Sequence, residues 1–183
     1  MSAADEQHLI VRAREGDGAA FRVLVERFMK QAYNIAYGFV RDHDDAEDIA
    51  QESFVRIYRS IHKFRGDAEF CTWLYRIVTN LSFDRIKQKR RSPVTLVPSD
   101  DLVMNLVGHN PDNAVESDVH AHIERALHQL PTLQRATVIL RHLNGLSTKQ
   151  VSGILGCSEG TVKTHLHRGL KKMRKMLYFL NEP

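Results

Sequence analysis

The sequence predicts an all-α protein: two small helical domains joined by a flexible linker. Two observations support this fold class. Apolar residues recur every three or four positions along most of the chain, a period typical of amphipathic helices. One stretch, residues 92–110, lacks this period and carries Pro, Ser, Gly and Asn, which favour turns and loops. We therefore expect a first domain over residues 1–91, a linker over 92–110 and a four-helix second domain over 111–183.

The first domain should be a helical bundle. Three helices are predicted over residues 18–40, 44–61 and 69–89, and a shorter helix near 5–15 precedes them. Each of the three longer segments carries one apolar stripe, which a bundle would bury in a common core. A loop that contains Gly66 separates the second and third of these helices.

The second domain should begin with Asn110 as a helix cap and Pro111 in the first turn, where proline is favoured. Its apolar period carries this helix to Pro131, and another helix over about 132–143 leads to Gly145.

Residues 146–175 then read as a helix-turn-helix. Ser147 and Ser158 are positioned to cap the two helices, and Gly156 supplies the left-handed turn between them. Apolar residues recur at helical spacing on one side of the second helix, and its opposite side is polar and basic, as expected of a helix that enters the DNA major groove. The alternative is an amphipathic hairpin with a solvated basic face. The predicted inward residues are Val162, Leu166, Leu170, Met173 and Leu177, and the outward ones are Gly160, Lys163, Thr164, His167, Arg168 and Lys171.

Composition favours a soluble, cytosolic protein. Of 183 residues, 43% are hydrophobic and 26% are charged, which is ordinary for a globular protein. The two cysteines, Cys71 and Cys157, are far apart and suggest reduced, buried thiols rather than a disulfide. The N-terminus lacks the apolar core of a signal peptide, and no run approaches the length of a transmembrane helix.

The charges alternate in blocks along the chain. Residues 42–52 hold six acids and no Lys or Arg, and residues 85–91 hold five bases and no acid. Residues 92–118 hold five acids and no base, whereas residues 159–175 hold six bases and one acid. This pattern suggests nucleic acid at the two basic blocks and basic protein surfaces at the acidic ones. Each run could instead be a solvated face.

The acidic helix over 44–61 cannot hold DNA. Asp44 and Asp48 are four residues apart, and Gln51 and Glu52 continue down the same side. This face could bind a basic protein surface or a metal ion. A metal is disfavoured because the carboxylates come from one helix and the chain lacks Glu-x-x-His and His-Glu-x-x-His. The ten histidines show no metal-ligand spacing either, so no cofactor is expected.

The helix over 69–89 combines aromatic residues with bases. Exposed aromatic rings can stack unpaired nucleotides while bases hold phosphates, and a pocket beside them could take a flipped base. Phe70 is expected in the core, whereas Trp73 and Tyr75 lie off the main stripe and could be either core or surface.

Three segments, in this order and spacing, resemble bacterial sigma factors of the extracytoplasmic-function (ECF) type of the sigma-70 family. They are DAEDIAQESFVRIYRSI, FRGDAEFCTWLYRIVTNLSFDRIKQKRR and LNGLSTKQVSGILGCSEGTVKTHLHRGLKKMR. A helix-turn-helix alone is common, but this combination is specific, and the match covers nearly the whole chain.

The resemblance implies a promoter-specific initiation factor, not an enzyme, that acts in the cytoplasm without a cofactor. The acidic helix would bind the clamp helices of core RNA polymerase, and the next loop and helix would open the −10 element. The linker would thread toward the active site, and the last helix would read the −35 element. An anti-sigma protein is a usual partner and can hold such a factor at the inner membrane face.

The residues implied for each role fall into three sets. Those for polymerase are Asp44, Asp45, Asp48, Gln51 and Glu52; those for the −10 element are Phe64, Arg65, Asp67, Trp73, Arg76, Asn80 and Asp84; those for the −35 element are Lys163, Thr164, His165, His167, Arg168 and Lys171. The family often has Arg in place of His165 and an aromatic or other residue in place of His167, so the −35 preference stays open.

Two other classes of protein compete with this interpretation. A repressor or activator with a helical sensor domain would also carry a helix-turn-helix, but it has no use for a single-strand reader. An enzyme acting on nucleic acid would need a nucleophile with its base, a phosphate-binding glycine loop or carboxylates converging from separate elements. None of these is found in the sequence.

Overall fold

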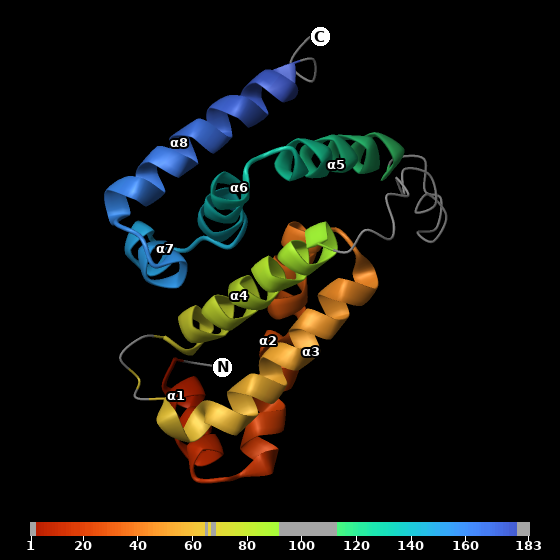
Figure 1. The fold of residues 1–183 in the computed structure, drawn as a ribbon. Helices are drawn as coiled ribbons and strands as arrows, with labels where there is room; N and C mark the ends of the chain where they lie inside the picture. Colours follow the sequence, from red (N-terminus) through yellow and green to blue (C-terminus); the bar gives the residue numbers. More distant parts are fainter. Residues whose placement is uncertain (1–2, 65, 67–68, 92–112, 179–183) are drawn as a thin grey trace.

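The computed structural model describes residues 3–64, 66, 69–91 and 113–178 (Figure 1). All regular elements within these ranges are helical, which confirms the all-α class. The predicted linker over 92–110, with Asn110 and Pro111, lies outside the described residues. The first region contains α1 (Ala3–Arg14), α2 (Gly18–Val40), α3 (His43–Ser60), the 3-10 turn η1 (Ile61–Lys63) and α4 (Phe70–Arg91). The second contains α5 (Asn113–His128), α6 (Thr132–Val138), the π-turn η2 (Ile139–Leu143), α7 (Thr148–Leu155) and α8 (Glu159–Met176).

Helix α2 is the centre of the first region and packs against α1, α3 and α4. Its buried stripe includes Leu24, Ile35 and Phe39, as the apolar period predicts. Asp17 begins the helix by accepting hydrogen bonds from the amides of Ala19 and Ala20, at 2.9 and 3.0 Å. These bonds satisfy helix donors that otherwise lack a partner.

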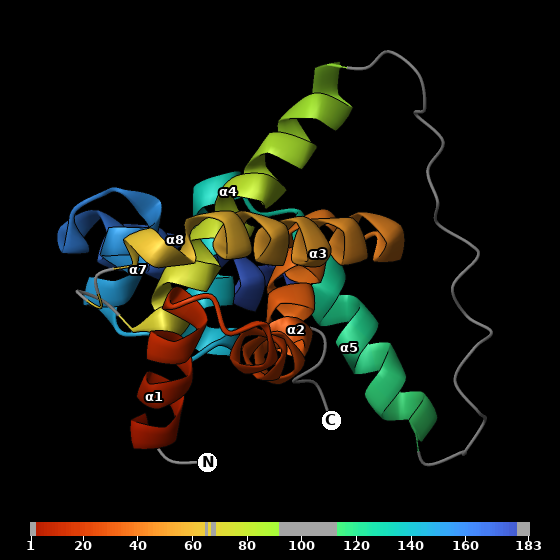
Figure 2. The same ribbon diagram turned by 90° about the horizontal axis from the view of Figure 1, so that it is seen from below.

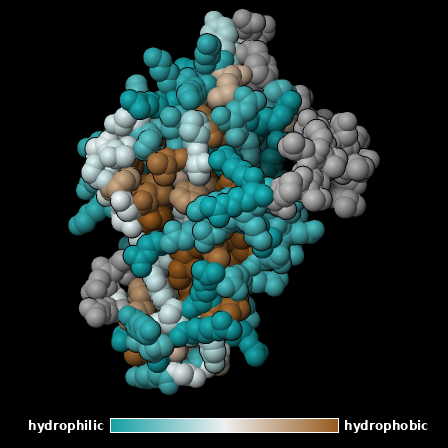
Figure 3. Space-filling model, viewed as in Figure 1, coloured by the Kyte–Doolittle hydropathy of each residue, from teal (hydrophilic) through white to brown (hydrophobic). Residues whose placement is uncertain are grey.

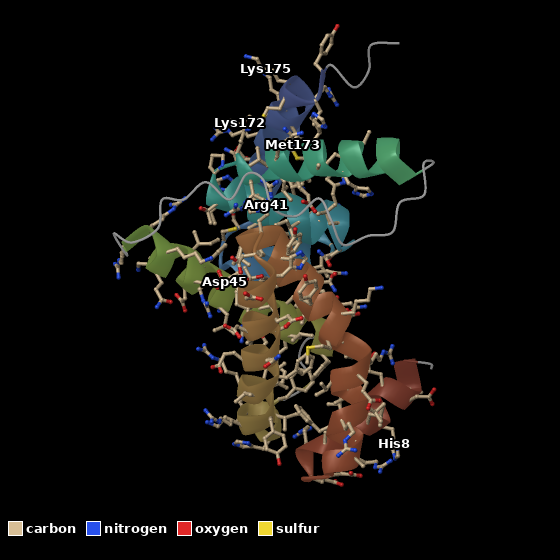
Figure 4. The ribbon with its side chains drawn as sticks, turned by 90° about the vertical axis from the view of Figure 1, so that its right-hand side faces the viewer. His8, Arg41, Asp45, Lys172, Met173 and Lys175 are labelled. Atoms are coloured by element: carbon tan, nitrogen blue, oxygen red, sulfur yellow. The ribbon has the colours of Figure 1, made fainter. Side chains whose placement is uncertain are left out.

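A buried carboxylate joins α3 to α4. Asp45 is 6% exposed, and its oxygens lie 2.5 Å from Nη1 of Arg85 and 2.5 Å from Nζ of Lys89. Asp42 caps α3 by accepting from the amide of Asp45 at 2.9 Å. That bond, together with Lys89, lowers the pKa of Asp42. The end of α4 is therefore held against the start of α3 (Figure 4).

The second region differs from the prediction at two helix boundaries. The helix expected to reach Pro131 ends at His128, because the turn tightens there and the amide of Leu130 donates to the carbonyl of Leu127. The helix expected over 132–143 changes at Ile139 into a π-turn. The amide and the side-chain amide of Asn144 both donate to the Ile139 carbonyl, at 3.1 and 2.9 Å, and this pairing fixes the wider turn.

The helix-turn-helix is confirmed in its caps and its turn. Ser147 and Gln150 form a reciprocal capping box at the start of α7. Gly156 ends α7 with a φ of 65°, a conformation that glycine adopts without steric cost. Ser158 accepts from the amide of Thr161 at 3.1 Å and begins α8. Val162 is fully buried, whereas Leu166, Leu170 and Met173 are half-buried.

Close packing of α8 on α6 depends on Gly169, which is buried. A Cβ atom at this position would lie 3.0 Å from Cγ2 of Val138 and 3.4 Å from the carbonyl oxygen of Gln134. A side chain fits here only if Val138 gives way by a few tenths of an ångström.

The two regions touch each other. Their buried apolar residues form one continuous cluster, and α7 lies next to the start of α4 in both ribbon views (Figures 1 and 2). Gly38 of α2 faces Ile139, whose Cδ1 would be 3.2 Å from a Cβ at Gly38.

A hydrogen bond between the buried Arg135 and the half-buried His128 fastens α6 to α5. Nη1 of Arg135 donates to Nδ1 of His128 at 2.9 Å, and Arg135 is 6% exposed. Burial, followed by the positive charges of Arg135 and Arg41, lowers the pKa of His128 to about 4. His128 is therefore neutral at pH 7 and accepts the hydrogen bond.

We expect Gly169→Ala to destabilise the protein, although Ala favours a helix by about 1 kcal/mol. Overpacking typically costs about 1–3 kcal/mol, and the new Cβ would lie 3.0 Å from Cγ2 of Val138, which is itself buried. The matched control is Gly153→Ala in α7, where a Cβ meets no atom within 4 Å. The control should raise the thermal unfolding midpoint measured by circular dichroism, and Gly169→Ala should lower it. An equal rise for both variants would show that α8 does not pack this closely.

The free energy of unfolding should decrease as the pH is lowered from about 6.5 to about 4. The unfolded chain protonates His128 near its ordinary pKa of about 6.5, whereas the folded protein resists protonation until about pH 4. The unfolded state thus binds more protons in this window, with a slope of at most about 1.4 kcal/mol per pH unit. His128→Gln keeps an acceptor for Arg135 and should flatten the slope in denaturant titrations at pH 7.5 and 5. His62→Gln, at an exposed site, should behave as wild type. Equal slopes for all three proteins would refute this role of His128.

Candidate functional site

The acidic side of α3 is largely open to solvent. Asp44 and Gln51 are exposed, and the side chains of Asp48 and Glu52 are 65% and 46% exposed. Glu52 forms an ion pair with Arg56 one turn later, at 2.9 Å. Exposed ion pairs of this type contribute little to stability. Asp48 lies 3.5 Å from Nη2 of Arg85. All four side chains are nevertheless accessible to a basic partner from solvent.

Asp45 does not belong to this face. The resemblance assigns Asp45 to the polymerase set, but in this structure its carboxylate is buried, points toward α4 and is shared by Arg85 and Lys89. Asp45 is the first residue of the buried stripe of α3, which continues with Ala46 and Ile49. Its contact with the polymerase stays a prediction.

A polar stripe runs along the outer side of α4. Arg76, Asn80 and Asp84 are exposed and spaced four residues apart, so they lie on one side of the helix. Trp73 stands at the head of this stripe and is half-buried. We call these four residues, with Thr72 and Glu69 at the start of the helix, the α4 stripe.

The aromatic residues near the start of α4 divide between core and surface. Phe64 is only 8% exposed, and its contact with the −10 element stays a prediction. Its ring stacks against Trp73 with centroids 5.0 Å apart, and Phe70 meets both rings edge-on. Tyr75 is in the core, where its hydroxyl donates to Gln31 at 3.0 Å. Trp73 therefore lies at the surface, and the rings of Phe64 and Phe70 hold it in place.

The basic run at the end of α4 is partly used inside the protein. Arg85 and Lys89 pair with the acids at the start of α3 and cannot serve as free phosphate contacts. Lys87, Arg90 and Arg91 are exposed. Two further residues predicted for the −10 element, Arg65 and Asp67, lie outside the described residues.

The outer side of α8 carries the predicted reading residues. Lys163, Thr164, His167, Arg168 and Lys171 are all exposed. His165 differs: it is half-buried, and its Nδ1 is buried without a hydrogen-bond partner. Lys172 and Lys175 project away from the body of the protein, whereas Met173 points toward α5 (Figure 4).

The described residues show no candidate metal site. They contain no group of three or more His, Cys, Asp or Glu side chains that could hold a metal ion. Both cysteines are free and half-buried, and burial together with Glu69 raises the pKa of Cys71 to about 11. No helix among these residues is both long and apolar enough to cross a membrane. Figure 3 shows a mostly hydrophilic surface with an apolar patch between α6 and α8.

Two residues that organise this arrangement are not among the predicted site residues. Gln150 both completes the α7 capping box and contacts α4, and its first role is readable from the Ser-x-x-Gln spacing. Gly169 interrupts a run of helix-forming residues, and that interruption is the signal of a close helix contact.

The chain was compared with known protein families and structures. Residues 24–92 match the family model of sigma-70 region 2, and residues 120–173 match that of sigma-70 region 4. The first match covers α3 and α4, and the second covers the helix-turn-helix.

Individual relatives agree with the family models. The ECF sigma factor SigW of Bacillus subtilis is 35% identical over 92% of this chain and 94% of its own length. The ECF sigma-E factor of Escherichia coli is 33% identical over 89% of each chain.

Two solved structures share the fold. CnrH, solved with the cytosolic domain of CnrY, has a TM-score of 0.71 at 24% identity and covers 94% of this chain and 96% of its own. Sigma factor RpoE of Bartonella quintana has a TM-score of 0.69 at 23% identity and covers 86% of this chain and 96% of its own. The chain therefore belongs to the ECF sigma factors of the sigma-70 family, which are not enzymes but direct promoter-specific initiation of transcription.

Proposed function

We propose that the work of initiation is divided among three surfaces: the acidic face of α3, the α4 stripe and the outer side of α8. Residues 1–91 would bind core RNA polymerase and the −10 element, residues 92–110 would link, and residues 111–183 would read the −35 element. The observation that carries this proposal is the separation of charge. A face of exposed acids and a basic reading helix lie on different regions, so protein and duplex DNA need not compete for one surface.

The acidic face fits a basic surface on the polymerase clamp helices. Asp44, Asp48, Gln51 and Glu52 present carboxylates and an amide on one side of α3. Charge complementarity of this kind chiefly raises association rates and selects partners. Asp45, held by Arg85 and Lys89, fixes the helix that carries the face.

The α4 stripe fits the unpaired bases of an opened −10 element. The Trp73 indole can stack on a base, Arg76 can hold a phosphate, and Asn80 can bond to a base edge. Phe64 would act from below by keeping the indole in place, since the two rings are stacked.

The outer side of α8 fits the major groove of the −35 element. Lys163, Thr164, His167 and Arg168 lie in its first half, where recognition helices contact base edges. Lys171 and Lys172 lie further along and would meet phosphates. His165, with its buried ring nitrogen, would support the helix more than it reads bases.

An anti-sigma protein is proposed as an inhibitory partner, and the cytoplasm as the place of action. RpoE, of similar fold, was solved with the anti-sigma factor NepR. Such an inhibitor could bind both small regions and cover the surface of each that is proposed to contact DNA. Co-purification from the native cell should recover a protein that competes with core polymerase.

Run-off transcription with core polymerase, followed by mapping of start sites, tests the proposal as a whole. The factor should start transcripts at defined positions only when core polymerase is present. Tight binding to a duplex operator by the factor alone would point to a repressor or activator instead.

Reversing charge at Asp48 and Glu52, as Asp48→Lys/Glu52→Lys, should weaken binding to core polymerase by at least tenfold. Surface changes of this kind rarely alter stability much, so circular dichroism should show an intact fold. The control, Glu15→Lys/Glu26→Lys, makes the same change in net charge at exposed positions of the first region that lie before α3 in the chain. Binding is measured by competition with labelled wild-type factor. If both variants compete equally well, the acidic face is not the polymerase contact.

Substitutions in the two groups of basic residues on α8 should impair promoter binding in different ways. Replacing Lys163 or Arg168 with Ala should cost about 1–3 kcal/mol and relax the preference at one −35 position. Replacing Lys171 or Lys172 should weaken all promoters alike and reduce the salt dependence of binding. A −35 substitution library, read with each variant, measures both effects. If Lys163 and Arg168 variants keep the wild-type base preference, α8 does not enter the groove in the proposed orientation.

A further inference from the structure

Arg135 of α6 carries a positive charge that is buried without a counter-ion. The residue is 6% exposed, and no carboxylate among the described residues forms an ion pair with it. Its Nη1 donates to His128 at 2.9 Å, but its Nε is buried and has no hydrogen-bond partner in the described part of the chain. A buried charge of this kind is costly, because the water that it has lost is not fully replaced.

Two further arginines lie near this buried one. Burial and then the positive charge of Arg90 lower the pKa of Arg135. Burial, followed by the charges of Arg135 and Arg41, lowers the pKa of His128. Arg41 and Arg90 are both exposed, and Figure 4 shows Arg41 where the end of α2 meets the helices of the second region. Positive charges therefore converge here from the ends of α2 and α4 and from α6.

The backbone of Arg41 indicates that its side chain has a use. Arg41 ends α2 with a φ of 54°, and every other residue with a positive φ in the described ranges is a glycine. Glycine or asparagine is usual at such a helix end, because other side chains are strained there. Strained residues are often found at ligand-binding sites. An arginine at this position keeps a long, exposed cation near His128.

The acids in this neighbourhood do not neutralise the three arginines. Asp42 follows Arg41 in the chain, but Lys89 pairs with it at 3.4 Å. Glu124 lies one turn before His128 on α5 and acts on Tyr37. Within the part of the chain that the structure describes, none of the three arginines forms an ion pair. One corner of the fold therefore holds three positive charges with no acid bound to any of them.

We propose that Arg41, Arg90 and Arg135 form a binding site for a phosphate group, carried by inorganic phosphate or by a small phosphorylated molecule. A guanidinium can donate two parallel hydrogen bonds to a phosphate, and a phosphate has enough acceptor oxygens to meet several such donors. Arg135 is the fixed part of the site, because burial and His128 hold its guanidinium in place. Arg41 and Arg90 approach the anion from solvent. This inference does not depend on which surfaces contact polymerase or promoter.

Isothermal titration calorimetry of the full-length factor, without polymerase or DNA, tests the site. Inorganic phosphate, pyrophosphate and AMP are titrated at pH 7.5 and constant ionic strength, because salt screens exposed charges. Phosphate should bind saturably with one site per chain, and pyrophosphate should bind more tightly because its charge is higher. AMP distinguishes the two sources of the phosphate group. If AMP binds at least as tightly as phosphate, the ligand is a phosphorylated molecule, and if AMP binds more weakly, the ligand is the free ion.

The variants leave the buried Arg135 in place, because its loss could unfold the protein. Arg41→Asn removes a charge at a backbone conformation that asparagine tolerates. It should weaken phosphate binding about tenfold, as expected for the loss of a hydrogen bond between charged groups. Arg90→Gln should also weaken it, and Glu124→Gln should tighten it by removing a nearby negative charge. The control, Arg59→Gln, makes the same change in net charge at an exposed position about 24 Å along α3 from its first residue.

Thermal unfolding supplies a second measurement, because a ligand that binds the folded state raises the unfolding midpoint. Phosphate should raise the midpoint of the wild type and of Arg59→Gln, and should raise that of Arg41→Asn much less at the same concentration. Circular dichroism checks that each variant is folded.

Two results would overturn the proposal. The first is the absence of a saturable phosphate or pyrophosphate signal in the wild-type factor, which would mean that water alone hydrates Arg135. The second is equal weakening of phosphate binding by Arg41→Asn and Arg59→Gln, which would mean that phosphate responds only to the overall charge of the protein.

Discussion

The carboxylate of Asp45 is the contact on which the working surfaces of the first region depend. It is buried between α3 and α4 and is neutralised by Arg85 and Lys89. A buried charge that loses its partners costs far more than a surface pair contributes, so this contact fixes how the two helices meet. One helix carries the acidic face and the other carries the α4 stripe. Their relative orientation is therefore set by an ion-pair cluster between the two helices.

The arrangement of the second region depends on a small side chain and a turn, not on an ion pair. Gly169 allows α8 to approach α6, and the π-turn at Ile139 redirects the chain into the helix-turn-helix. These features leave the outer side of α8 free of internal contacts, whereas its inner side is pinned by Val162. The half-buried, neutral His128 accepts from Arg135 and joins α5 to the same core. Reading of DNA bases requires a rigid support beneath the exposed side chains of α8, because loosely held side chains lose their orientation.

The contacts between the regions are both polar and apolar. Gln150, Glu69 and Thr72 are polar and partly solvated, and such hydrogen bonds contribute modestly to stability because water replaces them readily. Gly38 of α2 faces the Ile139 side chain of η2, and the buried apolar residues of both regions form one cluster.

The amino-acid sequence alone determined the helices and their caps, because the apolar period and the capping residues act over a few neighbouring positions. These caps are Ser147, Gly156 and Ser158. The sequence also identified the family. It also placed the exposed acids of α3 and the bases of α8. Only the tertiary structure decided which members of those runs are available. Asp45 and Phe64 turn inward because packing partners from α4 meet them there. Such pairings join residues far apart in the chain, and a local pattern carries no information about which distant side chain fills a given site.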